Sequence, residues 1–283
     1  MTRALIGCGQ LTWGRSGPSP EEVLRQIAQA GYDGAPSPAT DPEQTRKRFS
    51  DAGLKPAPGY LGAEFWDPAQ RDAIVERARE HARGHQQLGL TELYVAANLT
   101  PERRAVSGHV QPSDALSDEG YAVFAETLNA VGRATLEYGV SICFHNHVGS
   151  FIETRAEMDK LFSLVDRSVV FMGPDFGHLA WAGDDVVSLC RDYKDVIKTV
   201  HIKDINPDVL KEGVAQGWDY KQFSDHGIFT ELGTGFVDLK GSLDVLGSAN
   251  FPGWIIVETD VTQLPTALES ATVSRDYLRS IGM

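Results

Sequence analysis

The sequence has little of what marks secreted, membrane-spanning or nucleic-acid-binding proteins. It contains only three cysteines, at positions 8, 143 and 190, and an odd number of widely spaced thiols is typical of a reducing cytoplasm. No apolar run reaches the roughly 20 residues of a membrane span, and the first residues lack the layout of a signal peptide. The net charge of −13 excludes partners that require a basic surface. We therefore expect a cytoplasmic protein that binds neither nucleic acid nor membrane.

The chain also lacks serine- or glycine-rich tracts, proline runs and charge blocks of the kind that separate domains. We expect a single domain over residues 1–283, because α/β barrels of about 250 residues form one unit. Short apolar runs alternate with longer amphipathic stretches, which predicts repeated strand–helix units and a single (β/α)8 TIM barrel. The eight predicted strands are Ala4–Cys8, Gly34–Pro36, Lys55–Gly59, Glu92–Ala97, Gly139–His145, Val169–Pro174, Thr199–Ile205 and Gly253–Glu258.

Helical periodicity lies between these strands. A glycine often follows a predicted helix, at position 31, 53, 89 or 139, where a left-handed cap suits that residue. Ser19 is the predicted N-cap of the first helix. The predicted helices are Pro20–Ala30, Pro68–Leu88, Asp118–Tyr138, Thr154–Val165, Asp184–Tyr193 and Leu264–Ile281.

Two segments interrupt the alternation. Thr100–Ser117 is predicted to be a long polar loop. Asn206–Val237 is rich in aromatic residues and follows the seventh strand, so we expect an insertion at the rim of the barrel. It would serve either as a lid or substrate wall or as a subunit contact.

Metal-ligand residue types collect where predicted strands five to eight end. The four clusters are Phe144-His145-Asn146-His147, Pro174-Asp175-Phe176-Gly177-His178, His201-Ile202-Lys203-Asp204 and Val257-Glu258-Thr259-Asp260. Strand ends on one face of a barrel meet at the catalytic rim. Two imidazoles and two carboxylates suit Mn²⁺, Co²⁺, Fe²⁺ or Mg²⁺ rather than a sulfur-rich zinc site. The proposed metal ligands are His145, Asp175, His201 and Glu258, and His147 is an alternative or additional ligand.

Other residues near these strand ends are candidates for catalysis, each with a structural alternative. Lys203 shares the face of His201 in a strand and would stabilise an enolate, or form a salt bridge. Asp204 points the other way and is expected to be structural. His147 or Glu153 would act as the base, although a carboxylate at a helix start also compensates the helix dipole. His178 would act as an acid or bind substrate, or would stabilise a turn.

Aromatic residues near the predicted rim are candidates for substrate contact. Trp13, Tyr60 and His226 would contact the substrate, with Trp13 and Tyr60 forming an apolar wall for a sugar ring. As core residues, Trp13 and Tyr60 would be equally ordinary. Gly233-Thr234-Gly235 lacks the helix and lysine of a phosphate-binding loop, so we interpret it as a tight turn.

These clusters carry a resemblance to a known family. The sequence resembles the xylose-isomerase-like superfamily of sugar isomerases and epimerases, and within it the inosose dehydratase (2-keto-myo-inositol dehydratase) group. The resemblance covers most of the chain and is closest from about residue 120 to 260. The matching stretches are FHNHVGSFIET (144–154), PDFGHLAWAG (174–183), VHIKDI (200–205), GIFTELGTGFVD (227–238) and GWIIVETD (253–260).

The resemblance implies one divalent metal, typically Mn²⁺ or Co²⁺, with ligand roles for Asp175, His201 and Glu258. Many relatives have a glutamate as the ligand at the end of the fifth strand. This chain has His145 there, and the dehydratase-like branch also has a histidine at this position. Two positions depart from the pattern of relatives. Ketose 3-epimerases are expected to have an arginine shortly after the histidine of the seventh strand, and this chain has Asn206-Pro207 there. The second strand of relatives normally ends in a glutamate, and this chain has Gly34-Ala35-Pro36. The resemblance also implies a homo-oligomer.

The function expected from these residues is a metal-dependent carbon–oxygen lyase. The metal would polarise the ketone of a polyol such as an inosose, a base would remove the adjacent proton, and a β-hydroxyl would leave. The same residues would also serve a ketose or keto-sugar epimerase or isomerase, or a lyase that acts on 3-keto-glycosides. A barrel that only binds a polyol is the non-enzymatic alternative.

Overall fold

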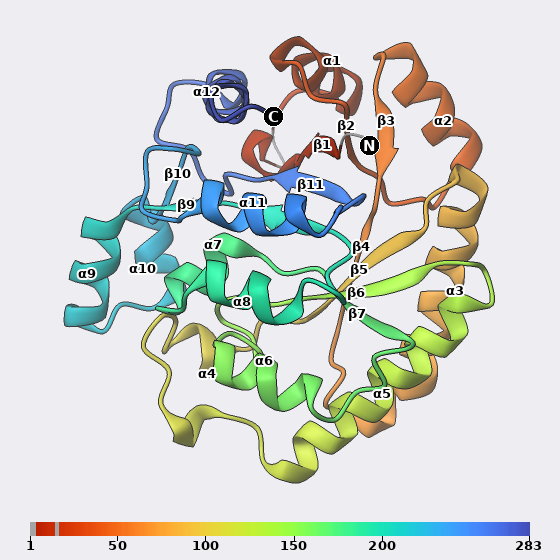
Figure 1. Cartoon of the computed structure of the whole chain (residues 1–283), viewed down its shortest axis with the longest axis vertical. Helices are drawn as coiled ribbons and strands as arrows, with labels where there is room; N and C mark the ends of the chain where they lie inside the picture. Colours follow the sequence, from red (N-terminus) through yellow and green to blue (C-terminus); the bar gives the residue numbers. More distant parts are fainter. Residues whose placement is uncertain (1–3, 15–16) are drawn as a thin grey trace.

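The computed structural model describes residues 4–14 and 17–283 and shows a ring of parallel strands surrounded by helices (Figure 1). The predicted barrel is confirmed. All eight predicted strand positions contain a strand, and their side chains are largely buried. The barrel strands are β1 (Leu5–Cys8), β2 (Gly34–Pro36), β3 (Lys55–Ala57) with β4 (Tyr60–Ala63), β5 (Glu92–Ala97), β6 (Ser141–His145), β7 (Val170–Met172), β8 (Val200–Ile202) and β11 (Trp254–Val257).

The strands form two parallel sheets, in the orders β3-β2-β1-β11-β8 and β4-β5-β6-β7. Isolated parallel bridges pair Met172 with Ile197 and Asp175 with His201, and so join β7 to the β8 side. The third barrel strand is split into β3 and β4 at Pro58 and Gly59. Pro58 has no N–H for a ladder, and the N–H of Gly59 donates to the His85 ring instead (2.9 Å). The break therefore follows from the missing N–H of Pro58 and from the tertiary contact of Gly59 with His85.

The helices pack outside this ring, and the four predicted glycine caps all have positive φ, between 72° and 90°. Ser19 caps the first helix by accepting from the N–H of Glu22, as expected. In the outer ring, α2 was implied only by the cap expected at Gly53 and was given no bounds, because it has few apolar residues, and α11, which contains Gly241 and Gly247, was not predicted. The longer helices are α1 (Pro20–Ala30), α2 (Pro42–Asp51), α3 (Arg71–Leu88), α5 (Asp118–Leu136), α6 (Arg155–Phe162), α8 (Val186–Tyr193), α11 (Leu239–Ser248) and α12 (Ala267–Ser280).

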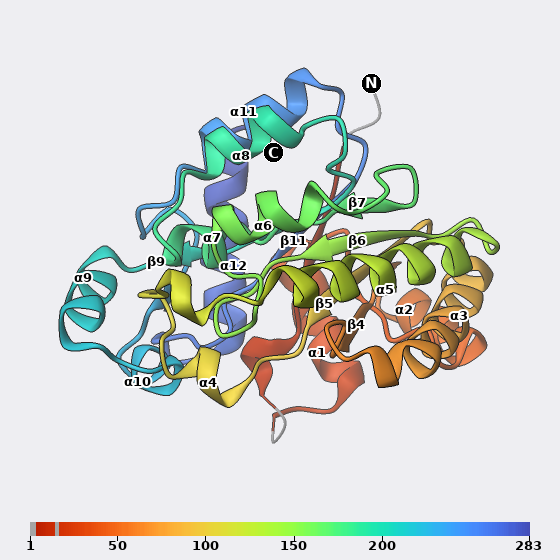
Figure 2. The same ribbon diagram turned by 90° about the horizontal axis from the view of Figure 1, so that it is seen from below.

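The two irregular segments lie together at one end of the barrel (Figure 2). The loop expected at 100–117 contains the short helix α4 (Pro101–Arg104). The segment at 206–237 contains α9 (Pro207–Gln216), α10 (Tyr220–Asp225) and β10 (Phe229–Thr230), which pairs with β9 (Asp204–Ile205). Asp204 accepts backbone N–H groups from Gly233, Gly235 and Val237, which confirms both its structural role and the tight turn.

Aromatic residues of the 206–237 segment pack against a barrel element, α7 (Phe176–Trp181). The Trp181 ring lies 5.1 Å from Phe223, 5.2 Å from Tyr220 and 5.6 Å from Phe229 between centroids. The segment therefore buttresses α7 from outside. It contributes no residue to the wall of the large cavity described below.

Among the described residues, no helix combines the length and the apolar character that crossing a bilayer requires.

Candidate active site

Four strand ends bring the predicted ligands to one place at the rim. His145 ends β6, His201 lies in β8, Glu258 follows β11 and Asp175 follows β7. All four residues are at most 8% exposed. Donor atoms of His145, Asp175 and His201 lie within 4.8 Å of one another, close enough to share one cation. Glu258 is next to this group, with Oε2 3.0 Å from His201 Nδ1.

Unpartnered nitrogens indicate that this group can accept a ligand. His145 Nδ1 and His201 Nε2 are buried and have no hydrogen-bond partner within the part of the chain that the structure describes. A buried polar atom without a partner costs free energy, which a bound cation or substrate would recover. Two imidazoles and a carboxylate form a donor set that fits a divalent transition metal.

Asp175 is held in position by its neighbours in the fold. Its Oδ1 accepts from the N–H of His178 and so caps α7. Its own N–H donates to Asn146 Oδ1 (2.9 Å), and Asn146 Nδ2 donates back to its carbonyl (3.3 Å). These contacts leave Oδ2 directed at Lys203 and His145. Gly177, which follows in α7, lets the helix approach Lys203, because a Cβ there would collide with that side chain.

Lys203 places a buried positive charge among the carboxylates. Its Nζ lies 2.7 Å from Asp175, 2.6 Å from Glu258 and 3.4 Å from Asp260. Burial opposes the charge, but Asp175, Asp260 and Glu258 outweigh it and raise the pKa of Lys203. Burial likewise opposes ionisation of Asp175 and Glu258, but Lys203 holds the pKa of each below its usual range. The cluster therefore keeps an ammonium group and two carboxylates charged.

A second group lies beside the first. Donor atoms of His147, His178 and Asp260 lie within 4.8 Å of one another, and the two imidazole rings are 3.6 Å apart. His147 Nδ1 contacts the carbonyl of Val148 (2.7 Å), which leaves Nε2 as the free acceptor. Burial and Lys203 lower the pKa of His147 to about 4, so its ring is neutral at pH 7. Burial raises the pKa of Asp260 to about 6.

A cavity of about 520 Å³ opens onto both groups. Its polar floor consists of His145, His147, His201, Lys203, Glu258 and Asp260. The opposite side comes from β1, β2 and the β3–β4 connection and includes Tyr60, as predicted for a substrate wall. Small molecules typically bind to proteins in concave sites where a few polar groups converge.

The comparisons with known proteins identify the family. Residues 24–281 match the family described as xylose isomerase-like TIM barrel. An inosose dehydratase of Clostridium beijerinckii is 32% identical over 267 residues, covering 92% of this chain and 88% of that protein. The chain belongs to the xylose isomerase-like TIM barrel family. The rhizopine catabolism protein MocC of Rhizobium meliloti is 29% identical over 85% of this chain and 74% of that protein.

Solved structures share the fold of this family. A 3-keto-D-glucoside 4-epimerase of E. coli, YcjR, superposes with a TM-score of 0.72, 17% identity and coverage of 99% of both chains. An L-ribulose 3-epimerase gives a TM-score of 0.72 with 19% identity, over 99% of this chain and 94% of that one. At these identities the likeness shows the barrel fold alone.

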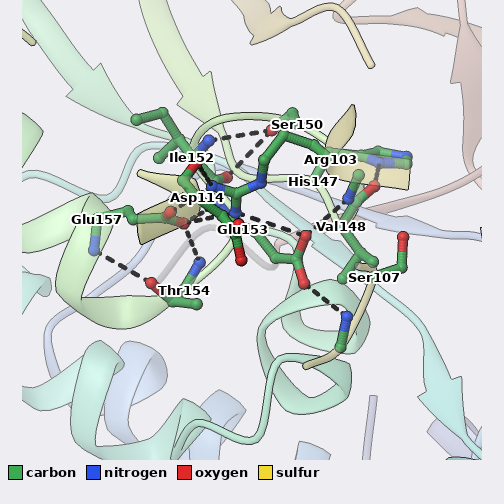
Figure 3. A network of polar contacts seen from close by, with 12 residues as sticks. Arg103, Ser107, Asp114, His147, Val148, Ser150, Ile152, Glu153, Thr154 and Glu157 are labelled. Atoms are coloured by element: carbon green, nitrogen blue, oxygen red, sulfur yellow. Dashed lines mark hydrogen bonds and ion pairs between the residues drawn. The ribbon is translucent and has the colours of Figure 1, made fainter. Parts of the chain in front are cut away.

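Glu153, which was predicted to be catalytic, does not line the cavity. Glu153 is fully buried, and its two carboxylate oxygens accept backbone N–H groups from Gly108 (2.7 Å) and Gly149 (2.8 Å). Figure 3 shows it beside Arg103 and Glu157, which form a bidentate ion pair. The prediction of Glu153 as the base is therefore corrected: its oxygens are occupied in joining two loops.

Three other predictions need correction for position. Trp13 is buried and donates to Gln26 on α1 (2.7 Å), so it is a core residue. His226 follows α10 and stacks on Trp218, with ring centroids 4.0 Å apart, and it does not line the cavity. His178 is fully buried behind His147 and does not line the cavity. No local pattern in the sequence indicates which neighbours these side chains contact.

Asp260 is the residue that sequence reasoning missed. It belongs to the quoted cluster at the end of the eighth strand, but no role was assigned to it. In the structure it lines the cavity, and its Oδ1 lies 3.4 Å from Lys203 Nζ. The period of two along a strand places positions 258 and 260 on one face, and that signal would have found it.

Proposed function

We propose that the chain is a divalent-metal-dependent carbon–oxygen lyase that dehydrates a keto-polyol such as an inosose. The observation that carries this proposal is the buried group His145, Asp175 and His201, whose unpartnered nitrogens lie beside the Lys203 ammonium at the cavity floor. The inosose dehydratase relatives, which match over 92% of the chain, support the choice of substrate class.

His145, Asp175 and His201 would hold the metal, with Glu258 as the fourth ligand. Mn²⁺ and Co²⁺ suit this mixed nitrogen and oxygen set. When bound, the metal supplies a Lewis acid for the ketone oxygen of the substrate. Lys203, whose positive charge is fixed by its carboxylate partners, stabilises the negative charge of the enolate.

Two residues at the cavity floor move the protons. His147 takes the proton from the carbon next to the ketone, because its ring is neutral, faces the cavity and has Nε2 free. The β carbon–oxygen bond then breaks as the new carbon–carbon double bond forms. Asp260 donates a proton to the departing hydroxyl, which leaves as water. Asp260 replaces His178 in this role because it lines the cavity and His178 does not.

The test is turnover of 2-keto-myo-inositol in D₂O by protein reconstituted with Mn²⁺ or Co²⁺, with metal content measured on the same sample. A lyase gives a new ultraviolet-absorbing enone or dione. Deuterium in an unchanged carbon skeleton would instead make the protein an epimerase or isomerase. Binding of the polyol with neither exchange nor product would leave a binding protein and overturn the proposal.

A further inference from the structure

The two sides of the cavity differ in chemistry. The charged residues come from β6, β8 and β11, whereas the facing side, from β1 to β4, presents Leu11, Pro36, Pro58 and Tyr60. A free inosose carries hydroxyl groups around its whole ring. The charged side offers partners for these groups, and the facing side, called the apolar wall below, offers few.

Two polar side chains, Gln10 in the apolar wall and Tyr94 beside it on β5, already have partners within the protein. The amide nitrogen of Gln10 donates to the carbonyl of Pro36 (2.8 Å). The hydroxyl of Tyr94 is hydrogen-bonded to Thr199 in the core, so the edge and face of its ring are what remain for a ligand. Pro36 and Pro58 have no N–H. A substrate hydroxyl at this wall would lose hydrogen bonds to water without full replacement, which is unfavourable.

The apolar wall also leaves large side chains uncovered. Leu11 is 60% exposed and Tyr60 is 42% exposed, although both line a cavity. The Tyr60 ring continues the wall to the cavity floor, since it contacts His145 edge-on with centroids 5.4 Å apart. Covering these side chains with an apolar group would remove their surface from water and contribute to binding.

We propose that the apolar wall binds an aryl substituent, joined through oxygen to the polyol ring of the substrate. This inference rests on the proposed function, because the floor would hold the ketone and hydroxyl groups while the wall holds the substituent. It narrows the substrate class to ethers and glycosides of keto-polyols. Leu11 and Tyr60 are then the residues that determine specificity.

The test uses three ligands that lack a ketone and therefore cannot react: phenyl β-D-glucopyranoside, methyl β-D-glucopyranoside and myo-inositol. Their affinities for the metal-loaded protein are compared by titration calorimetry. We expect the phenyl glucoside to bind about 10-fold more tightly than the other two, because only its ring covers the wall. Equal affinities of the three ligands would overturn the proposal.

Two variants test whether the preference for the phenyl glucoside comes from the apolar wall. Leu11→Asn should abolish the preference for the phenyl group, and its exposure means that the fold tolerates the change. Leu164→Asn, at a residue that is 43% exposed and outside the cavity, is the matched control and should retain the preference. A preference that survives Leu11→Asn would contradict the assignment. Failure of inosose turnover with the preference intact would remove the proposed reaction and leave the binding site standing.

Discussion

Two buried clusters of ionic side chains lie near the rim, and they differ in how completely the protein satisfies them. In the first, called the Arg103 cluster, Glu157 accepts both ends of the Arg103 guanidinium and two backbone N–H groups. Glu153 accepts two more N–H groups. Every carboxylate oxygen of this cluster therefore has a partner within the chain. Arg103 Nε is buried without a hydrogen-bond partner among the described residues, but Arg103 does not line the cavity.

The second, called the Lys203 cluster, comprises Lys203, Asp175, Glu258 and Asp260 and adjoins the rim histidines. Here His145 Nδ1 and His201 Nε2 are buried without a hydrogen-bond partner in residues 4–14 and 17–283, and a cavity opens onto these two histidines. Burial and charge are common to both clusters, so neither property distinguishes a site from a structural network. Unsatisfied atoms that face a cavity do, because they need something the chain does not supply.

The largest effect should come from removing the charge of Asp175. Asp175→Asn keeps the oxygen that caps α7 but loses the carboxylate, so we expect metal content to fall and turnover to drop about 10⁴-fold. Asp185→Asn is the matched control, since Asp185 caps α8 in the same way at a distance from the cavity. Metal content and turnover are measured for both variants. Normal metal binding by Asp175→Asn would place the cation elsewhere.

Breaking the Arg103 cluster should affect stability instead. Arg103→Met leaves Glu157 buried without its cation, and we expect the free energy of unfolding to fall by about 3–5 kcal/mol. Arg155→Met, which removes two ion pairs nearer the surface, with Asp159 and Asp192, should cost less than about 1 kcal/mol. Denaturant unfolding of the two variants is the measurement. Similar losses would mean that the Arg103 cluster contributes no more than a surface pair.

The fold could be predicted because its signals are local. Buried parallel strands read as short apolar runs, and all eight were found from the sequence, even Gly34–Pro36 with only three residues. The bounds of α2 were missed because it has few apolar residues, and α11 was missed because Gly241 and Gly247 interrupt its helical pattern. The division of the third strand depends on a contact with His85, 26 residues away, which no local pattern shows.

The positions of the site residues could also be predicted, but not their partners. Because parallel strands end at one rim, His145, Asp175, His201 and Glu258 were expected to meet, and the structure brings them together. Glu153 looked equally suitable as an acid–base residue. Its oxygens are taken by backbone groups of Gly108, 45 residues away, and Gly149. Such contacts are tertiary and leave no trace in a single sequence.

Lys203→Met tests whether a bound metal ion can replace the lost positive charge of the Lys203 cluster. The same metal should not replace the lost charge of the Arg103 cluster in Arg103→Met. We expect turnover to fall about 10²- to 10³-fold, because an enolate-stabilising charge is lost. The metal-free variant should unfold more easily, since Asp175 and Glu258 lose their ammonium partner. Added Mn²⁺ should restore stability to Lys203→Met but not to Arg103→Met, as measured by thermal unfolding with and without metal. An equal response of the two variants to Mn²⁺ would erase the distinction between the clusters.

The smallest effect concerns the pH dependence of the Arg103 cluster. Burial raises the pKa of Glu153 from 4.5 to about 7, although Gly149 and Gly108 oppose this. Between these values the folded protein holds a proton that the unfolded chain has released. Glu153 therefore stabilises the fold at pH 5, and that contribution is lost as the pH rises through about 7.

Glu153→Gln has no proton to release, so it separates this contribution from all others. The unfolding free energy of the wild type minus that of Glu153→Gln should fall by about 2 kcal/mol between pH 5 and pH 7, as measured by denaturant unfolding. Metal content should not change, because Glu153 does not reach the cavity. Parallel pH profiles would show that Glu153 ionises in the fold as it does in the unfolded chain. A loss of metal would show that the two clusters are coupled through the Gly149 turn, which follows His147 directly along the chain.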